Sequence, residues 1–576
     1  MDTVTNSNTN MSTHVEHTEL TELRKEDNVL SPVLGMKDEK SSSAKNLHKR
    51  KRRYRNLPKQ LLYSLDESGF KLKTHQKYGV NWMISKELQN KKSLYNVSGG
   101  LLCDEPGMGK TIQTATMMLA NKLDKTLIIL PPNLMDQWED TLSRILPDSK
   151  IRRHYKNKIF ASESELQNCD NDIIITSMYS LKDVSVLHTI RWGRVIFDEV
   201  DKIRNSTCKI GKACCLLKSN IKWGLTGTPI QNSEKDFLQL FKFIRSNTEY
   251  ESYQDVRPCK KGLCKFAITS MMRRVKSEIP ELKQLDSNIE YHNVECLFIS
   301  EDEKTIYKDI RDNLIQKLRA IMELQGHNTH GGNINMMMMT IFLRLRQTSI
   351  HPHIAINAMD EHNKVFKNFN TPSSKYTKML EIVEGKVQLG EKTIIFCNFK
   401  EEMQNISELL TENNILNELY NGSMSPAEKI TVLNSFIDQK YLYLNMLRIG
   451  QQYSSDIPLE CIKNISKFLP QVLIIQIKSG GVGLNLQQFN NIIFTIPDWN
   501  PANEIQAIAR AHRMGQKRKV NVYNLILTDT EFDTIDQRIL FIERSKNEII
   551  DTFYTNSGKK KHTPSPTAND LQKLIL

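Results

Sequence analysis

Six short apolar runs, each three or four residues long, recur along this 576-residue chain and constrain its fold more than any other feature. They are apolar on both faces, as strands buried inside a parallel sheet are, and segments with a helical pattern separate them. One series lies before about residue 245 and the other after about residue 376, which predicts two similar parallel α/β sheets. Open sheets of this kind bind ligands at the carboxyl ends of their strands. The runs are 127–130, 173–175, 195–197, 393–396, 472–475 and 492–494.

The composition favours a globular protein with a polyanionic partner. Its length allows two or three domains, and 39% hydrophobic with 25% charged residues is ordinary for a globular chain. The net charge of +13 favours a polyanion. No apolar run approaches the length of a membrane span, and the polar N-terminus lacks the apolar region of a signal peptide. The ten cysteines have no metal-site spacing, so we expect reduced thiols and no structural metal.

Both ends of the chain have the composition of tails. Residues 1–56 are polar and close on Lys49–Arg55, in which six of seven residues are cations. Such a segment buries too little apolar surface to fold alone. It is either a nuclear-import signal or DNA contact, or simply a solvated charge run. Residues 556–576 form the second tail, and the Met336–Met339 run between the two series is expected to fill a core.

A glycine-rich turn, Asp104–Thr111, has the chemistry needed to hold a triphosphate. A strand is predicted over 99–103 and a helix over 112–120, so backbone N–H groups at the helix start would bind phosphate oxygens. Lys110 would contact the β- and γ-phosphates and Thr111 would hold Mg²⁺. The strict form of this loop has glycine where the chain has Asp104.

Two further segments supply the remaining chemistry of hydrolysis. Asp198 and Glu199 follow the run at 195–197, where Asp198 would hold Mg²⁺ through water and Glu199 would orient or deprotonate the attacking water. The hydroxyls and glycines of 224–232 could sense the γ-phosphate. Far along the chain, Arg510 and Arg513 stand three residues apart, and one helical turn would aim both the same way.

Taken in order, these segments resemble the SNF2 family of superfamily 2 ATPases, which are double-stranded-DNA translocases. The resemblance runs from Leu72 to about Leu527. It implies that Gln76 reads adenine and that an acidic residue normally replaces the first loop glycine. It also implies DNA contacts from Pro131 and Trp138 in the first half. The nucleotide-binding loop would comprise Asp104, Glu105, Pro106, Gly107, Met108, Gly109, Lys110 and Thr111.

The second half of the chain carries the later family motifs. Residues 272–276 and 343–352 resemble landmarks peculiar to SNF2 proteins, and 394–399 resembles motif IV. In the family, Arg510 and Arg513 would be arginine fingers. Coupling and DNA contact are implied for Thr226, Gly227 and Thr228 in the first half, and for Ser479, Gly480, Gly481 and Gly483 in the second.

Three departures from the family pattern stand out. The acidic tetrad reads Asp198, Glu199, Val200, Asp201, with aspartate in place of the usual fourth histidine, which raises the question of coupling to Thr226. Ala509 replaces a usual glycine. Residues 437–471 exceed the family spacing, and a surface excursion is the expectation for them.

The resemblance implies two RecA-like parallel-sheet lobes with an SNF2-type helical insertion between them. ATP and Mg²⁺ would be bound, and double-stranded DNA would be the partner, together with chromatin or transcription proteins. The expected location is the nucleus (the host nucleus for a viral protein), and the resemblance leaves the oligomeric state open, with a monomer as one option. The compact chain resembles viral global transactivator proteins. A hydrolysis-deficient DNA-binding regulator and a strand-separating helicase remain alternatives. The expected parts are a basic tail at 1–56, lobes at 57–290 and 376–555, an insertion with linker at 291–375 and a tail at 556–576.

Overall fold

The computed structural model describes most of the chain between residues 57 and 544. The tails predicted at 1–56 and 556–576, the segment 437–468 and the glycines Gly481 and Gly483 lie outside the described residues. The described ranges are 57, 59–88, 98–155, 163–167, 172–181, 185–205, 208–230, 234–245, 270–325, 332–358, 369, 372–436, 469–480 and 484–544.

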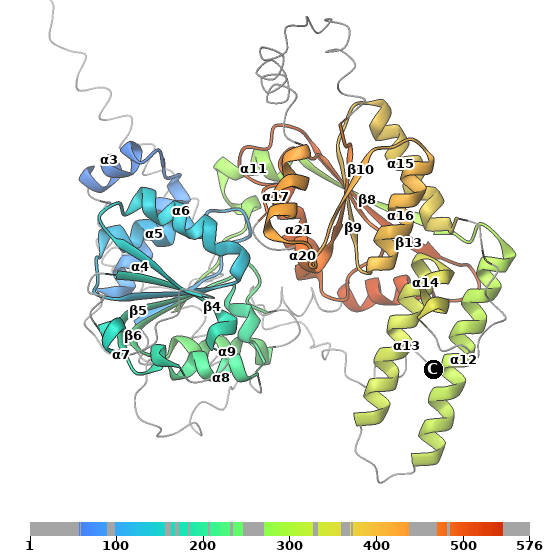
Figure 1. Cartoon of the computed structure of the whole chain (residues 1–576), viewed down its shortest axis with the longest axis horizontal. Coiled ribbons are helices and arrows are strands. Elements are labelled where there is room, and N and C mark those ends of the chain that lie inside the picture. Colours follow the sequence, from blue (N-terminus) through green and yellow to red (C-terminus); the bar gives the residue numbers. More distant parts are fainter. Residues whose placement is uncertain are drawn as a thin grey trace, which may run out of the picture.

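The first lobe is built on a seven-stranded sheet in which every pairing is parallel, in the order β3-β4-β2-β5-β6-β1-β7. Its strands are β1 (Ser98–Leu102), β2 (Thr126–Leu130), β3 (Lys150–His154), β4 (Asp172–Ser177), β5 (Arg191–Asp198), β6 (Lys218–Leu225) and β7 (Met271–Met272). Helices cover both faces of this sheet (Figure 1). They are α3 (Lys59–Glu67), α4 (Thr74–Glu87), α5 (Lys110–Ala120), α6 (Met135–Ile145), α7 (Glu163–Gln167), α8 (Lys209–Leu216) and α9 (Glu234–Ile244).

The second lobe repeats this design with six parallel strands in the order β10-β11-β9-β12-β13-β8. They are β8 (Ile289–Leu297), β9 (Thr393–Cys397), β10 (Asn417–Tyr420), β11 (Val472–Gln476), β12 (Asn491–Phe494) and β13 (Val520–Thr528). The helices are α15 (Ser374–Gln388) and α16 (Lys400–Glu412) on one face, and α17 (Pro426–Ser435), α20 (Ile477–Gly480) and α21 (Pro501–Ala511) toward the other. The prediction of two parallel α/β lobes is confirmed.

Strand β8 shows how the two lobes share the chain. Short helix α11 (Pro280–Asp286) leads out of the first lobe, and β8 then pairs along its whole length with β13 at the edge of the second sheet. The boundary expected between residues 290 and 291 therefore falls inside a strand of the second lobe. Because β8 is an edge strand whose residues are partly exposed, it contains no continuous apolar run that would have predicted a strand at this position.

A helical hairpin projects from the second lobe (Figure 1). It consists of α12 (Glu301–Gln325) and α13 (Gly332–Ile350), followed by α14 (Pro352–Asn357). Of the methionine run, Met338 is buried in the hairpin core, whereas Met336 and Met339 are 68% and 59% exposed. The expectation that the run fills a core therefore holds for Met338 and for the partly buried Met337, and is wrong for Met336 and Met339.

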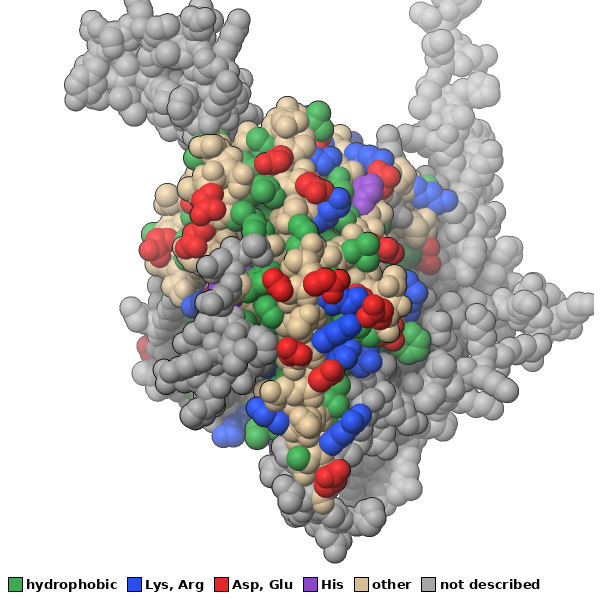
Figure 2. Space-filling view, turned by 90° about the vertical axis from the view of Figure 1, so that its right-hand side faces the viewer, with side chains coloured by type: hydrophobic (Ala, Val, Ile, Leu, Met, Phe, Trp, Pro, Cys, Tyr) green, Lys and Arg blue, Asp and Glu red, His purple; other side chains and the backbone are tan. Residues whose placement is uncertain are grey.

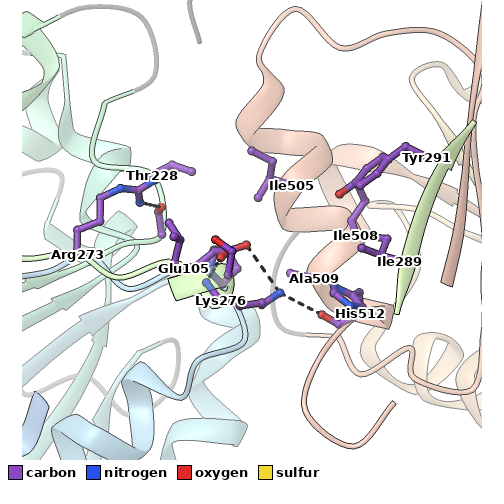
Figure 3. A pocket seen from close by; sticks show the side chains of 14 residues that line it. Glu105, Thr228, Arg273, Lys276, Ile289, Tyr291, Ile505, Ile508, Ala509 and His512 are labelled. Carbon is purple, nitrogen blue, oxygen red and sulfur yellow. Dashed lines mark hydrogen bonds and ion pairs between the residues drawn. The ribbon is translucent and has the colours of Figure 1, made fainter. Parts of the chain in front are cut away.

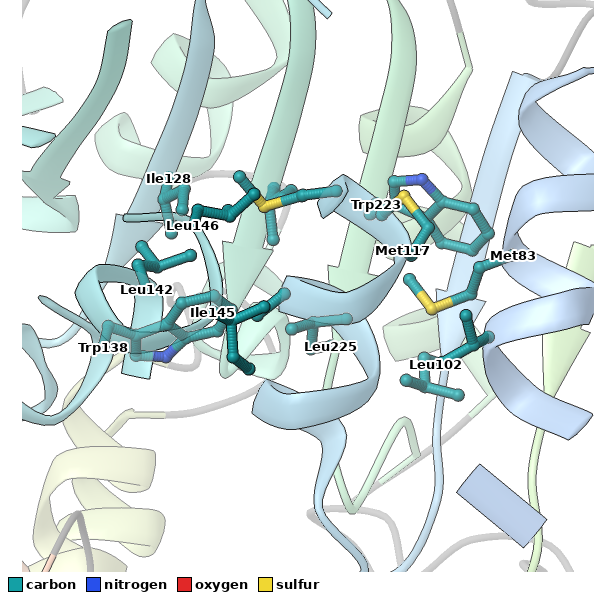
Figure 4. Close-up of a cluster of buried hydrophobic side chains, with 14 of the residues drawn as sticks. Met83, Leu102, Met117, Ile128, Trp138, Leu142, Ile145, Leu146, Trp223 and Leu225 are labelled. Carbon is teal, nitrogen blue, oxygen red and sulfur yellow. The ribbon is translucent and has the colours of Figure 1, made fainter. Parts of the chain in front are cut away.

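The core of the first lobe follows from strand periodicity. In β2, Ile128 and Leu130 pack on one side of the sheet, while Leu127 and Ile129 pack on the other. Figure 4 shows the first side, where Trp138 of α6 and Met117 of α5 meet the strands. Because helices bury both faces, neither face of β2 can be polar, and the run reads as continuously apolar.

The described residues also show how charge is distributed on one face, whether any helix could span a membrane, and the state of the cysteines. On the face drawn in Figure 2, acidic and basic side chains are interspersed among the described residues. No described helix combines the length and apolarity required to cross a membrane. Six cysteines fall within the described ranges and all are free thiols, and no metal-binding group of three or more His, Cys, Asp or Glu side chains occurs in those ranges.

Candidate active site between the lobes

The loop between β1 and α5 is shaped for phosphate. Gly107 and Gly109 have φ of 87° and 81°, a left-handed conformation that glycine adopts without steric cost. No side chain caps the start of α5 at Gly109, which suits an anion at that helix end. Lys110 and Thr111 are the first two residues of α5, and Lys110 Nζ donates to Asp104 O at 2.7 Å, across the loop. These residues fit a bound triphosphate.

Asp104 contacts protein groups at the base of the phosphate loop. Its carboxylate is fully buried, and Arg274 Nε donates to Oδ1 at 2.9 Å while a second guanidinium nitrogen pairs with Oδ2. Gln113 Nε2 also donates to Oδ2, at 3.1 Å. Both carboxylate oxygens thus bond to protein groups, and nucleotide binding by Asp104 stays a prediction. The acid stands where the strict loop has glycine because it pairs with Arg274 and braces the base of the loop.

Gln76 also lies against the loop. It is 2% exposed, and its Nε2 donates to Met108 O at 3.2 Å while its Oε1 accepts from the Lys73 backbone at 2.9 Å. The ring of His75 lies 3.3 Å from the same carbonyl. Helix α4 therefore supports the turn at Met108, and adenine recognition by Gln76 stays a prediction.

The acidic pair lies at the carboxyl end of β5. Asp198 ends the strand, and Glu199 adopts φ 56° and ψ 48°, a left-handed conformation that is uncommon for a residue with a side chain. The Glu199 backbone N–H donates to Asp198 Oδ1 at 3.0 Å. Among the described residues, Glu199 Oε2 is buried without a hydrogen-bond partner. A buried carboxylate oxygen left unpaired is costly, and a bound cation or water would relieve it.

Trp138 holds the other oxygen of Asp198. The indole Nε1 of this α6 residue donates to Asp198 Oδ2 at 2.7 Å, and its side chain is 1% exposed. Burial and the neighbouring Glu199 raise the pKa of Asp198 to about 6, while the indole hydrogen bond lowers it. Pro131 is buried as well. Neither side chain is on the surface, and DNA contact by Trp138 and Pro131 stays a prediction.

Asp201 connects the acidic segment to the next loop. Thr226 Oγ1, just past β6, donates to Asp201 Oδ1 at 2.8 Å, and the Thr228 backbone donates to Thr226 Oγ1 at 3.1 Å. A Cβ added to Gly227 would lie 2.7 Å from the ring of Pro106, so this glycine lets the loop touch the phosphate loop. Asp201, which replaces the usual histidine, is therefore joined to Thr226 by a direct hydrogen bond, although this departure had raised the question of coupling between them. Burial and Glu199 raise the pKa of Asp201 to about 7.

The two arginines come from the second lobe but not from one helix face. Arg510 lies in the last turn of α21, which ends at Ala511, and His512 leaves the helix with φ −91° and ψ 79°. Arg513 is therefore beyond the helix, and the expectation that one helical turn aims both arginines alike is wrong. The chain leaves the helix after Ala511. No glycine follows Ala511 directly, so no local signal in the sequence indicates that the helix ends there.

Arg510 nevertheless faces the acids of the first lobe, whereas Arg513 lies beside the first lobe and its Nη1 donates to Leu484 O of the second lobe at 3.4 Å. Burial lowers the pKa of Arg510, and the opposing charges of Glu199 and Asp198, across the lobe boundary, raise it. Burial also lowers the pKa of Arg513. A Cβ placed on Gly107 would lie 3.6 Å from Arg513 Cβ, so the phosphate loop and Arg513 are in contact distance. The structure thus brings together the loop, the acids and the arginines.

A cleft of about 390 Å³ separates the lobes beside the phosphate loop (Figure 3). Its first-lobe wall includes Glu105, Pro106 and Thr228, and its second-lobe wall includes Ile505 and His512. Ser479 and Gly480 lie apart from this wall, in α20 after β11, where Ser479 Oγ donates to Gln476 Oε1 at 3.3 Å. DNA contact by that segment stays a prediction.

The sequence marked residues 272–276 as a family landmark but did not predict the contacts that this segment makes after β7. Arg273 donates to Gly227 O at 3.1 Å, Arg274 pairs with Asp104, and Lys276 contacts Glu105. The available signal was a dense cationic block, Arg273–Lys276, facing an acidic residue at an unexpected loop position.

The fold and site define a two-lobed, helicase-like ATPase. Residues 75–354 match the model of the SNF2-related domain, and residues 374–515 match that of the helicase conserved C-terminal domain. The chain therefore contains an SNF2-related domain followed by a helicase C-terminal domain, as the sequence motifs predicted.

Relatives of known sequence are distant in identity. Chromatin remodeling factor mit1 of Schizosaccharomyces pombe is 24% identical over 88% of this chain, which spans only 34% of that protein. A probable global transactivator of Orgyia pseudotsugata multicapsid polyhedrosis virus is 26% identical over 79% of this chain, which spans 86% of the viral protein. A solved Sulfolobus solfataricus SWI2/SNF2 ATPase core in complex with dsDNA is 22% identical, with 84% of this chain and 92% of that chain covered. Its TM-score of 0.34 is too low to support a structural conclusion.

Proposed function

We propose that this protein is a Mg²⁺-dependent translocase on double-stranded DNA that uses ATP to remodel protein–DNA complexes in transcription or repair. The observation that carries the proposal is Arg510, which the second lobe presents to Asp198 and Glu199 of the first. A site completed by two lobes can hydrolyse ATP only in one relative position of those lobes. Hydrolysis then becomes linked to their movement.

Each side chain has a distinct place in the proposed reaction. Lys110 and the start of α5 hold the phosphates, while Asp198 and Thr111 would hold the metal ion, which would neutralise phosphate charge. Glu199, with its unpaired oxygen, orients the attacking water and accepts its proton. Arg510 and Arg513 stabilise the charge that develops on the γ-phosphoryl group, and an arginine in this role typically contributes about 10³–10⁵ in rate.

The hydrogen bond from Thr226 to Asp201 links the acidic segment of the site to the loop after β6. A change at Glu199 alters the field at Asp201, which is buried beside it. Asp201 holds Thr226, and Gly227 packs on Pro106 of the phosphate loop. We infer that this chain of contacts couples the nucleotide state to the surface that grips DNA, so aspartate serves where the family usually has histidine.

Duplex DNA and a transcriptional role are supported by charge and by the relatives. The net charge of +13 suits a phosphate backbone. The face in Figure 2, where basic and acidic side chains are interspersed, adds no support for DNA contact at that face. The viral relative, of which this chain spans 86%, is named a probable global transactivator, and mit1 is named a chromatin remodeling factor. We favour a compact transcriptional regulator that works in the nucleus, with chromatin or transcription proteins as partners.

The test is phosphate release with and without duplex DNA. Lys110→Ala should abolish turnover because the β- and γ-phosphates lose their cation, and Glu199→Gln should bind ATP without cleaving it. Glu67→Gln is the matched control, since Glu67 is exposed at the end of α3. Parent-like turnover by Glu199→Gln would refute the assignment of the catalytic acid.

A second assay separates translocation from strand separation. A translocase should displace the third strand of a triplex while leaving a plain duplex annealed. Strand displacement from the duplex would identify a helicase instead. DNA binding without any stimulated hydrolysis would identify a regulator that has kept only the fold.

A further inference from the structure

Three cations in the segment Arg273–Lys276 each contact a different part of the ATP site. Arg273 Nη1 donates to Gly227 O at 3.1 Å, in the loop after β6. Arg274 pairs with Asp104 at the base of the phosphate loop. Lys276 contacts Glu105 of the same loop and also reaches the second lobe. This segment therefore joins elements that lie far apart in the sequence.

Lys276 spans the boundary between the lobes. Its side chain is buried, with Nζ 3.9 Å from Glu105 Oε1 in the first lobe. The same ammonium donates to His512 O in the second lobe at 3.4 Å, and Figure 3 shows both contacts. The Lys276 backbone N–H also donates to Glu105 Oε2, at 2.7 Å. His512 lies between Arg510 and Arg513, so the ammonium holds the backbone that carries the two arginines.

The chain on either side of these contacts packs the same loop. Met108 of the phosphate loop, Ile279 and Leu282 form a small apolar cluster with Met514. Farther along, Asn288 Nδ2 donates to Arg518 O at 2.8 Å. The loop 512–518 is thus held at its start, middle and end by residues 276–288, the stretch that connects the lobes covalently.

We propose that Lys276 is a positioning residue for hydrolysis, which sets Arg513 against the phosphate loop. This inference rests on the proposed function, because it assumes that Arg513 acts on the γ-phosphoryl group. A buried ammonium needs acceptors, and these come from two lobes. Separation of the lobes would deprive Lys276 of His512 O, so its burial favours the arrangement in which the arginines face the phosphates. Lys276 is the side chain that lets the phosphate loop sense this arrangement.

The perturbation is Lys276→Met, which keeps an unbranched side chain of similar size and removes the ammonium. DNA-stimulated kcat should fall by about 100-fold, the loss typical of a reacting group displaced by about 1 Å. The KM for ATP should change far less, because Lys110 and α5 still hold the phosphates. Lys283→Met is the matched control, since Lys283 is an exposed lysine on the same connecting stretch. Its kcat should equal that of the parent.

A double-mutant cycle with Arg513→Ala decides whether Lys276 acts through Arg513. Arg513→Ala alone should cut turnover severely, and adding Lys276→Met should then change little. Full multiplication of the two losses would overturn the positioning role while leaving the proposed function intact. Parent-like turnover by Arg513→Ala would instead refute the finger itself, and with it the proposed function.

Thermal melting of every variant separates chemistry from stability. Activity is compared at a temperature where each variant is folded. Lys276→Gln, whose amide can form hydrogen bonds in a buried site, repeats the cycle if the methionine variant does not fold. The same non-additive pattern is expected from it, and an independent loss would again overturn the proposal.

Discussion

Substituting Trp138 by phenylalanine tests how Asp198, the carboxylate proposed to bind the metal ion, is held. The indole N–H lies 2.7 Å from Asp198 Oδ2, and both side chains are buried. Phenylalanine keeps an aromatic ring against Leu142 and Ile145, the neighbours drawn in Figure 4, but has no donor. Asp198 would then keep only the Glu199 backbone N–H on its other oxygen. Its orientation toward the metal ion should become less well defined.

The expected effect is a weaker response to Mg²⁺. A hydrogen bond to a charged group contributes about 1.5–3 kcal/mol, which corresponds to about 10–100-fold in an equilibrium constant. Loss of a partner behind a metal ligand typically costs about the same factor. The pKa of Asp198, already about 6, should rise further without the indole. Since the protonated acid binds metal poorly, the acidic limb of the rate profile should move to higher pH.

The assay is a Mg²⁺ titration of DNA-stimulated ATPase activity, repeated as Mg²⁺-dependent binding of a fluorescent ATP analogue. Trp192→Phe is the matched control, because Trp192 is equally buried in the same lobe and its indole donates to Leu187 O at 2.9 Å, away from Asp198. Both variants lose stability, but only Trp138→Phe should need about 10–100-fold more Mg²⁺. Equal Mg²⁺ midpoints for both variants and the parent would show that Trp138 only packs the core.

Two other predictions concern pH and salt. Burial raises the pKa of Asp201 to about 7 from 3.8, so between these values the folded state holds a proton that the unfolded state has lost, and rising pH destabilises the fold. Asp201→Asn keeps an acceptor for Thr226 without the charge, so its melting temperature relative to the parent should rise across this range; a constant difference would contradict the shift. Affinity for duplex DNA should fall steeply with salt, and deleting residues 1–56 should flatten that slope without removing stimulated ATPase activity. An unchanged slope would mean that the tail makes no phosphate contacts.

The sequence predicted the sheets and the chemistry of the site because both leave local signals. A strand buried on two faces must be apolar at every position, as Leu127–Leu130 is, and the loop before Lys110 needs glycines for its left-handed turns. The edge strand β8 lacks this constraint, since alternate residues such as Tyr291 and Leu297 remain exposed. It could be placed only by its pairing with β13.

Side-chain partners across the fold could not be predicted in the same way. Trp138 and Asp198 are sixty residues apart in sequence, and Lys276 and His512 are 236 apart. The order of the motifs led us to expect a DNA contact from Trp138. In the structure this α6 residue is buried, and its indole donates a hydrogen bond to Asp198. Similarly, spacing suggested that Arg510 and Arg513 share a helix face, but only the observed end of α21 at Ala511 shows how the chain turns.

The charges of the site explain why the second lobe is needed. Asp198 and Asp201 are buried on either side of Glu199, whose backbone is in a strained conformation that costs about 1–3 kcal/mol. Burial and the charge of Glu199 raise the pKa of Asp198 and of Asp201, so ionising these two acids beside Glu199 is unfavourable without nearby cations. Lys110 supplies one from within the first lobe, and Arg510 supplies another only from the second. The central position of β5, paired with β2 and β6, keeps the acids fixed despite this repulsion. The cation of Arg510 therefore relieves the repulsion among the acids of the first lobe, and this attraction holds the two lobes together. A bound nucleotide with its metal ion would change this attraction at each stage of hydrolysis.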